Sequence, residues 1–320
     1  MIGALCDTSA EHVADSGTRE LEVSFGYRYQ TSHRHFVGTV EQKQRDELNT
    51  EIVNTYHLFD IGLAYRLNSR WTLTGSVPIL VADRNQLYPP RGFYEVNSIG
   101  DISAGVRAWL WRPPTESGGN IALGISLKMP TGKNDAASMA IGRDGNPVLA
   151  TADQSLQAGD GGWGFALDTQ MYKRIPWGNT VYFSGTYLFN PRNTTDVQTF
   201  RIRPGEEIMS VTDQYLFRGG ISHAVPKIRG LAASIGGRIE GVPVRDAFGS
   251  SDGFRRPGYA ISVDPGLVYA RGRYLFAVNV PFAVERNRRR SVTDLRNGSH
   301  GDAAFADYVL TLSVTRRFNF

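Results

Sequence analysis

The 320-residue sequence contains a single cysteine, Cys6, and no long apolar segment. A lone cysteine excludes an internal disulfide and leaves a metal site without a second sulfur ligand. No stretch approaches the roughly 18 consecutive apolar residues that a membrane-spanning helix needs, which excludes a helical membrane protein. A hydrophobic fraction of 41% and a mean hydropathy of −0.28 do not exclude the membrane itself, because a barrel strand faces lipid with only every second residue.

A complete signal peptide is also missing. The basic segment and the apolar stretch of about 7 to 15 residues that define one are absent from the start of the chain. We expect residues 1–18 to be a tail or the remnant of a signal peptide, and residues 19–320 to form one domain. A tail is favoured over a lipid anchor on Cys6, because Leu5 stands where a small residue usually precedes a lipidated cysteine.

Alternation of apolar and polar residues is the strongest pattern present. In the last segment the apolar positions are Tyr308, Leu310, Leu312, Val314, Phe318 and Phe320. A period of two indicates a β-strand with one face in an apolar medium. The pattern recurs about twelve times, and predicts strands near 20–29, 56–66, 71–82, 99–111, 121–129, 162–173, 180–189, 213–222, 231–243, 259–269, 274–285 and 307–320.

The predicted connections alternate between short and long. Short turns are expected at 67–70, 112–119, 175–178, 224–230 and 270–273, and long loops at 31–55, 84–98, 132–161, 190–212, 245–258 and 286–303. This layout is typical of an outer-membrane barrel with its turns in the periplasm. We therefore predict an all-β fold, an antiparallel up-and-down transmembrane β-barrel of about 12 strands in the outer membrane of a Gram-negative bacterium.

A soluble β-sandwich is the alternative fold. It does not account together for the regular apolar faces, the alternating connection lengths and the aromatic last strand. Four prolines, Pro78, Pro243, Pro265 and Pro281, oppose the barrel, because proline cannot donate to a strand ladder and a closed barrel has no free edge. We expect β-bulges at these positions.

Several segments resemble a known protein family. They are His35 to Thr39, Asp83-Arg84, Gly100 to Ile102, Ala122 to Gly132, and residues 157–164 with their Gly-Asp-Gly-Gly-Trp-Gly run. In these the chain resembles an outer-membrane β-barrel family of transporters, also described as proteins of the MetA pathway of phenol degradation. The resemblance covers the first half of the chain and implies a barrel that takes up small, aromatic organic molecules.

The polar faces of the predicted strands define a candidate lumen. The charged residues expected to line it are Glu22, Arg28, Asp60, Arg66, Asp101, Arg107, Lys128, Asp168, Arg218, Arg238, Glu240, Asp264, Glu285 and Arg317. Such a wall either lines a water-filled pore or locks together as salt-bridged filling. We favour a channel for passive passage of small hydrophilic or aromatic solutes, with the loop at 132–161 as its constriction. The alternative is a closed barrel that serves as a structural platform or receptor through its outer loops.

Enzymatic activity is not expected. His57 lies on an outward face, but no serine or cysteine nucleophile shares that face. His33 and His35 have no second pair of ligands, and Asp144 and Asp160 lack the spacing of a calcium loop, so neither a metal nor another cofactor is predicted.

Partners are predicted mainly from charge. The net charge of +4 is dispersed, which argues against nucleic acid. The run Arg286, Arg288, Arg289 and Arg290 begins an outer loop, where guanidinium groups could bind lipopolysaccharide phosphates; a solvated face is the alternative. Outer-membrane lipids, a small-molecule solute and the barrel-assembly machinery, through the strand ending at Phe320, complete the expected partners.

Overall fold

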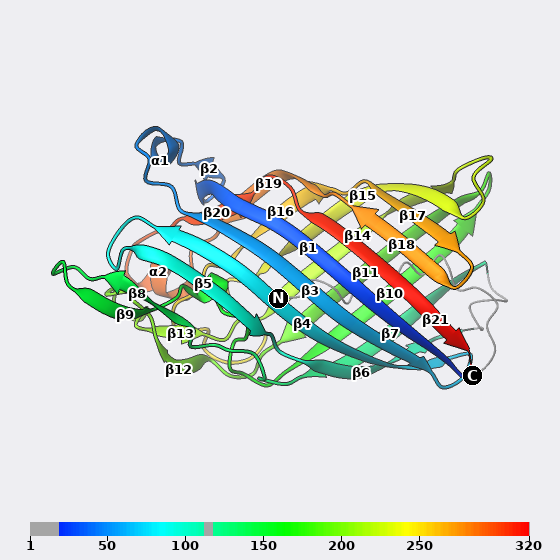
Figure 1. Cartoon of the computed structure of the whole chain (residues 1–320), viewed down its shortest axis with the longest axis horizontal. Coiled ribbons are helices and arrows are strands. Elements are labelled where there is room, and N and C mark those ends of the chain that lie inside the picture. Colours follow the sequence, from blue (N-terminus) through cyan, green and yellow to red (C-terminus); the bar gives the residue numbers. More distant parts are fainter. Residues whose placement is uncertain (1–18, 112–117, 320) are drawn as a thin grey trace.

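The structure is a computed structural model that describes residues 19–111 and 118–319. The predicted tail at 1–18 with Cys6, most of the turn at 112–119, and the terminal Phe320 lie outside the described residues. Figure 1 shows a barrel of tilted antiparallel strands with two short helices, α1 (Gln44–Glu47) and α2 (Val292–Arg296), at one end.

The barrel has twelve strand positions. Eight hold one continuous strand: β1 (Glu20–Val37), β3 (Val53–Arg66), β4 (Trp71–Gln86), β7 (Gly119–Lys128), β10 (Gly164–Ile175), β11 (Asn179–Phe189), β14 (Gln214–Ala224) and β15 (Leu231–Val242). Four hold two strands in line: β5 (Gly92–Ile99) with β6 (Ser103–Trp109), β16 (Gly258–Val263) with β17 (Gly266–Arg271), β18 (Tyr274–Asn279) with β19 (Phe282–Arg288), and β20 (Ala303–Ala306) with β21 (Leu310–Asn319). Beyond the barrel lie β2 (Val40–Glu41) and the hairpins β8 (Ala137–Ile141)–β9 (Pro147–Thr151) and β12 (Thr194–Gln198)–β13 (Ile208–Ser210).

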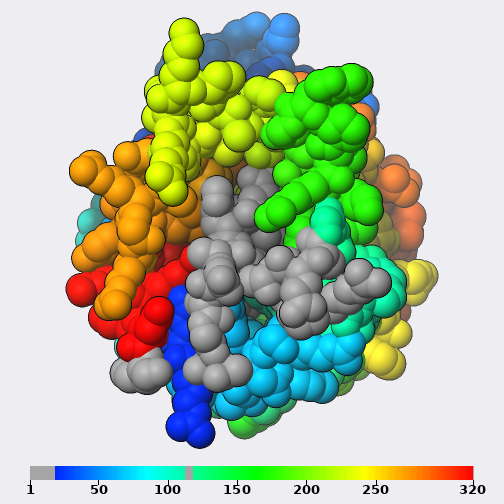
Figure 2. Space-filling view, turned by 90° about the vertical axis from the view of Figure 1, so that its right-hand side faces the viewer, coloured from blue at the N-terminus to red at the C-terminus, as the bar shows by residue number. Residues whose placement is uncertain are grey.

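The first and last barrel positions pair with each other. Tyr27 of β1 lies opposite Phe59 of β3 on one side and Leu312 of β21 on the other. Figure 2, which views the short-turn end, shows the blue start of the chain beside its red end. Where the strands pair around the ring, their backbones are satisfied internally, which a sheet needs in lipid because no water is available there.

The outward face carries an apolar belt. Leu123, Ile125 and Leu127 of β7 are each about half exposed, while Ala122, Ser126 and Lys128, on the alternate positions, are buried. Among the described residues, no helix is long and apolar enough to cross a membrane. The closed antiparallel barrel and its apolar outer face confirm the predicted fold and the predicted place in a Gram-negative outer membrane.

The two ends of the barrel differ in the length of their connections, as predicted, although the prediction of one long loop is wrong. The short turns lie at the right of Figure 1 and the long connections at the left. The predicted loop at 84–98 is mostly strand, because β4 continues to Gln86 and β5 starts at Gly92. β1 likewise continues to Val37. These extensions lie at the long-loop end, beyond the apolar belt, where a strand no longer needs an apolar outer face.

The prolines interrupt strands more often than they create bulges. Pro265 lies between β16 and β17, Pro281 between β18 and β19, and Pro243 follows the last residue of β15. Pro78 stays inside β4, next to the break between β5 and β6, and its carbonyl accepts a 2.8 Å hydrogen bond from Gly100 N. The missing proline N–H groups are thus accommodated mainly by splitting one barrel position into two strands.

Candidate pore and its constrictions

Inward-facing ion pairs cross between barrel strands. Arg107 of β6 and Asp168 of β10 lie on either side of β7, opposite Gly124, and approach to 2.6 Å. A Cβ atom at Gly124 would collide with the Asp168 carboxylate. The glycine is therefore required here because the ion pair lies directly over it.

The other predicted lumen residues share this behaviour, since most of their charges meet a partner on another strand or loop. The contacts are Glu22–Arg317 (3.0 Å), Arg66–Glu20 (3.1 Å), Arg218–Asp264 (3.1 Å), Lys128–Asp101 (3.5 Å), Lys128–Asp160, and Asp60 accepting from the Ser76 hydroxyl at 2.5 Å. These contacts are those of a cross-linked wall. The part that these residues take in solute passage remains a prediction.

Glu285 departs from its predicted place. The pairing of β16 with β19 shifts register by one residue at Val284, so that Glu285 lies opposite Ile261 and Arg286 opposite Ala260. A one-residue bulge reverses the side-chain alternation beyond it. Glu285 consequently accepts a 2.8 Å hydrogen bond from Tyr259 at an exposed position, and Arg286 turns inward.

One ion pair spans the lumen itself. Arg28 of β1 donates from Nη2 to both carboxylate oxygens of Glu240 on β15 at 3.0 Å, and Arg238 donates to the same carboxylate at 2.9 Å. Three barrel positions separate β1 from β15 along the shorter way round. A contact between strands that are not neighbours must cross the interior, so we call Arg28, Arg238 and Glu240 the crossbar.

The loop at 132–161 folds into the barrel. Leu156, in the short 3-10 helix Gln154–Leu156, is fully buried together with Ala152 and Ala158. They pack in one core cluster with inward side chains of β3, β4 and β5: Tyr56, Leu58, Leu80, Ala82, Tyr94 and Val96. We call residues 152–158 the plug, because they occupy the part of the lumen nearest the long-loop end.

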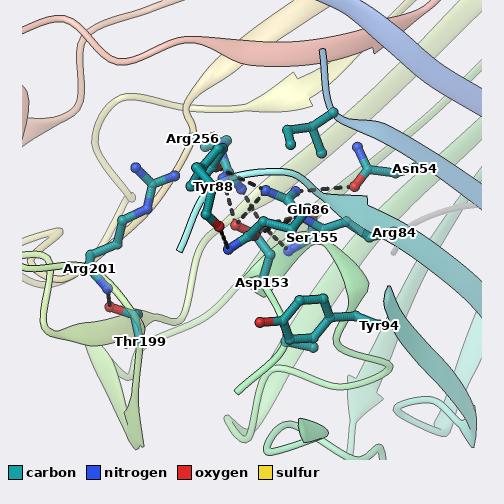
Figure 3. A network of polar contacts seen from close by, with 12 residues as sticks. Asn54, Arg84, Gln86, Tyr88, Tyr94, Asp153, Ser155, Thr199, Arg201 and Arg256 are labelled. Carbon is teal, nitrogen blue, oxygen red and sulfur yellow. Dashed lines mark hydrogen bonds and ion pairs between the residues drawn. The ribbon is translucent and has the colours of Figure 1, made fainter. Parts of the chain in front are cut away.

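A buried polar network holds the plug to the wall (Figure 3). Asp153 receives a bidentate ion pair from Arg256, whose Nη2 lies 2.6 Å from Asp153 Oδ2. Arg84 of β4 lies 3.7 Å from the same carboxylate and donates to the Tyr88 hydroxyl at 3.2 Å. Arg201 approaches from another outer loop and stacks on Phe254, with its Cζ 4.6 Å from the ring centre.

The charged groups of this network shift one another's pKa values. Burial would raise the pKa of Asp153, but Arg256 and Arg84 outweigh it and hold that pKa well below its usual range. Burial, together with the charge of Arg256, lowers the pKa of Arg201. Arg256 and Arg84 therefore share the carboxylate of Asp153, and Arg201 lies near enough for its charge to act on the same carboxylate.

A cavity of about 340 Å³ lies in the lumen between the plug and the crossbar. Arg28 and Glu240 line one side of it, and Ser155 and Arg256 another. The remaining wall mixes small apolar and neutral polar side chains, among them Gln30, Ser32, Tyr56, Leu58, Gln214, Ala260, Ser262, Ala304 and Val309. The space suits a small solute that carries both apolar and hydrogen-bonding groups.

The barrel wall is incompletely paired beside this cavity. Between the bridges Phe282–Tyr308 and Gly38–Arg288, the described backbone shows no ladder joining β19 to β20. Arg286 spans this seam with its side chain, donating to the Ala306 carbonyl at 3.1 Å and to Asp307 at 2.7 Å. A side chain thus replaces backbone pairing at one place in the wall.

The predicted lipopolysaccharide contact is partly wrong. Arg286 is buried at this seam, and Arg288 is 2% exposed and bound to Asp294 at 2.9 Å. Neither guanidinium can reach a phosphate outside the protein. Arg289 and Arg290 are exposed, and their contact with lipopolysaccharide remains a prediction.

The histidines have structural contacts. His35 lies 2.9 Å from Asp302 and accepts a hydrogen bond from Ile52 N, while His57 Nδ1 lies 2.8 Å from the Tyr27 hydroxyl. Within residues 19–111 and 118–319, no three His, Cys, Asp or Glu side chains are placed to hold a metal ion.

Arg84 and Asp153 were not predicted as site residues from the sequence. Arg84 has the same inward parity as Leu80 and Ala82, and would have been found if the strand had been continued beyond residue 82. The sequence around Asp153 indicates only a helix cap. The Asp153 carboxylate accepts a hydrogen bond from Ser155 N at 3.1 Å, as capping residues do. No local pattern announces its partner Arg256, because the two lie 103 residues apart.

No family model and no curated protein matches the sequence, but solved structures do. An outer membrane channel from Pseudomonas putida F1 is 12% identical, with 95% of this chain and 97% of that chain covered and a TM-score of 0.63. The β-domain of the Bordetella autotransporter BrkA is 14% identical, with 95% and 100% covered and a TM-score of 0.50. Such likeness shows the fold, which is that of Gram-negative outer-membrane barrels, and membership of the MetA-pathway family remains a prediction.

Proposed function

We propose that this chain is an outer-membrane channel for passive passage of small hydrophilic or aromatic solutes. The observation that carries the proposal is the cavity of about 340 Å³ in the lumen, lined by residues of both the plug and the crossbar. A barrel filled only for rigidity has no need of such a space. The likeness of its fold to an outer membrane channel agrees with this function.

The plug is the gate in this proposal. It belongs to a connection between barrel strands and not to the wall, so it can leave the lumen without breaking strand pairing. The plug is kept in the lumen by the burial of Leu156 and by the ion pairs of Asp153. The wall of the cavity, with Tyr56, Gln30 and Gln214, offers hydrogen bonds beside apolar surface, as an aromatic alcohol requires.

Conductance of two matched variants in planar bilayers tests the gate. Leu156→Asp places a charge in the apolar cluster and should expel the plug, giving larger and longer conductance steps than wild type. Leu149→Asp is the control, because Leu149 belongs to the same loop and is 68% exposed. Swelling of liposomes in phenol and in a small sugar then compares the two solute classes.

A closed barrel that acts through its outer loops is the second candidate. The observation in its favour is the segment comprising β2 and α1, which projects beyond the wall in Figure 1 and exposes Val40 and Leu48 by about two thirds. If wild type, Leu156→Asp and Leu149→Asp are all silent in bilayers while correctly folded, the channel proposal fails and this one replaces it.

A further inference from the structure

The short-turn end of the barrel is strongly basic. Basic residues in its turns and at its strand ends include Arg70, Lys173, Lys227, Arg229, Arg271, Arg273 and Arg316. Among the described residues of these turns and strand ends, the carboxylates are Glu20 and Glu22, which bind Arg66 and Arg317. The positive charge at this end is therefore not neutralised by the residues that the structure describes.

Two of these arginines form a row with a tyrosine. Arg271 of β17 is the register partner of Tyr274 on β18, and Tyr274 is the partner of Arg316 on β21. All three side chains are exposed. Figure 2 shows the orange turn that carries Arg271 and Tyr274 lying against the red end of β21.

This row faces the membrane. Phe276 and Leu312, two to four residues further along the same faces, are 44% and 39% exposed in the apolar belt. Arg316 Cζ lies 5.4 Å from the ring centre of Tyr274 and 4.7 Å from that of Phe318. The two rings fix the guanidinium at the inner edge of the belt, where an aromatic girdle meets lipid headgroups.

No carboxylate neutralises the row. Within the described part of the chain, neither Arg271 nor Arg316 has an acidic group within ion-pair distance. Arg317, the neighbour of Arg316, points to the other face and is bound to Glu22. Two exposed guanidinium groups about one tyrosine thus remain available at a level where lipid phosphates lie.

We propose that Arg271, Tyr274 and Arg316 bind the phosphate of an anionic phospholipid in the inner leaflet of the outer membrane. Guanidinium groups bind phosphate oxygens in pairs of parallel hydrogen bonds, and two of them can hold one headgroup from both sides. Tyr274 stands between the two arginines in the strand register, and its ring supports the Arg316 guanidinium. The site takes a phosphodiester with net negative charge, such as phosphatidylglycerol, in preference to a zwitterionic phosphatidylcholine. This inference does not depend on the channel function.

Native mass spectrometry of the full-length protein in detergent tests the site. Wild type, Arg271→Gln/Arg316→Gln and the control Lys227→Gln/Arg229→Gln are titrated with phosphatidylglycerol and with phosphatidylcholine. The control also removes two positive charges, but from an exposed turn outside the row. Two lost guanidinium contacts at a membrane surface predict affinity for phosphatidylglycerol weaker by roughly 30-fold in the first variant.

Two further variants test the tyrosine. Tyr274→Phe keeps the ring that supports Arg316 and should bind nearly as wild type, whereas Tyr274→Leu removes the ring and should bind more weakly. Folding of each variant is verified by its faster migration before heating in gel electrophoresis. The proposal is overturned if the row variant loses no more affinity than the control, or if the two lipids bind wild type equally.

Discussion

Replacing Asp153 by asparagine should release the plug. The substitution keeps the shape of the side chain but removes the charge that faces Arg256 and Arg84. Both arginine side chains are largely buried, so they would be left without their shared carboxylate. Breaking a buried ion pair from one side costs about 3–5 kcal/mol, which corresponds to a factor of roughly 10² to 10⁴ in a local equilibrium.

The backbone pairing of the strands does not depend on this network of side chains, so the cost should appear as local opening of the outer loops. We expect single-channel recordings of Asp153→Asn to show open intervals that are at least tens of times more frequent than in wild type. Asp252→Asn is the control, because the Asp252–Arg296 pair on a neighbouring loop is largely exposed. Recordings of Asp153→Asn that match those of both wild type and control would refute the assignment of Asp153 as the plug's anchor.

Three further predictions concern the charges of the lumen and loops. Glu240→Ala leaves Arg28 and Arg238 without their carboxylate, so the reversal potential in a salt gradient should shift toward anion selectivity; an unchanged potential would place the crossbar outside the conduction path. Burial would raise the pKa of Asp302, but the hydrogen bond to His35 and the charge of Arg45 lower it to about 2, so its stabilising effect is present above about pH 4 and is lost as the pH falls toward 2. Hydrogen exchange should then speed up in residues 292–303 over that range, and Asp302→Asn should remove the pH dependence. Arg286→Ala leaves the Ala306 carbonyl and Asp307 without a donor at the seam, at a cost of about 1–3 kcal/mol; thermal unfolding should occur at a lower temperature than for Arg289→Ala, whose parent side chain is exposed.

The wall of the barrel could be predicted because lipid imposes a rule on each strand separately. Leu123, Ile125 and Leu127 must be apolar because they face lipid, whichever strands pair with theirs. The sequence of this one strand is therefore enough to identify its lipid-facing side. The same rule fails above the belt. On the strand Gly92–Ile99 the exposed positions include Glu95 and Asn97, whereas the apolar Tyr94 and Val96 are buried against the plug, so its sequence carries no continuous apolar outer face.

The constrictions could be predicted only in part, because they depend on distant contacts. The inward parity of Arg28 and Glu240 follows from alternation, but their meeting across the lumen depends on barrel diameter and register. The inward fold of the loop at 132–161 was expected, whereas its fastening by Arg256 was not. Glu285 was assigned to the wrong face because a bulge at Val284 leaves no mark in the sequence.

The crossbar also has a consequence for the order of assembly. Arg28 and Glu240 lie 212 residues apart, on the first strand and on a strand late in the chain. They cannot meet while the sheet is still an open ribbon, because β1 reaches β15 only after β21 has joined β1. The Arg28–Glu240 ion pair therefore forms only once the barrel has closed. In a barrel that stopped one strand short of closure, Arg28 on the first strand would lack the Glu240 carboxylate.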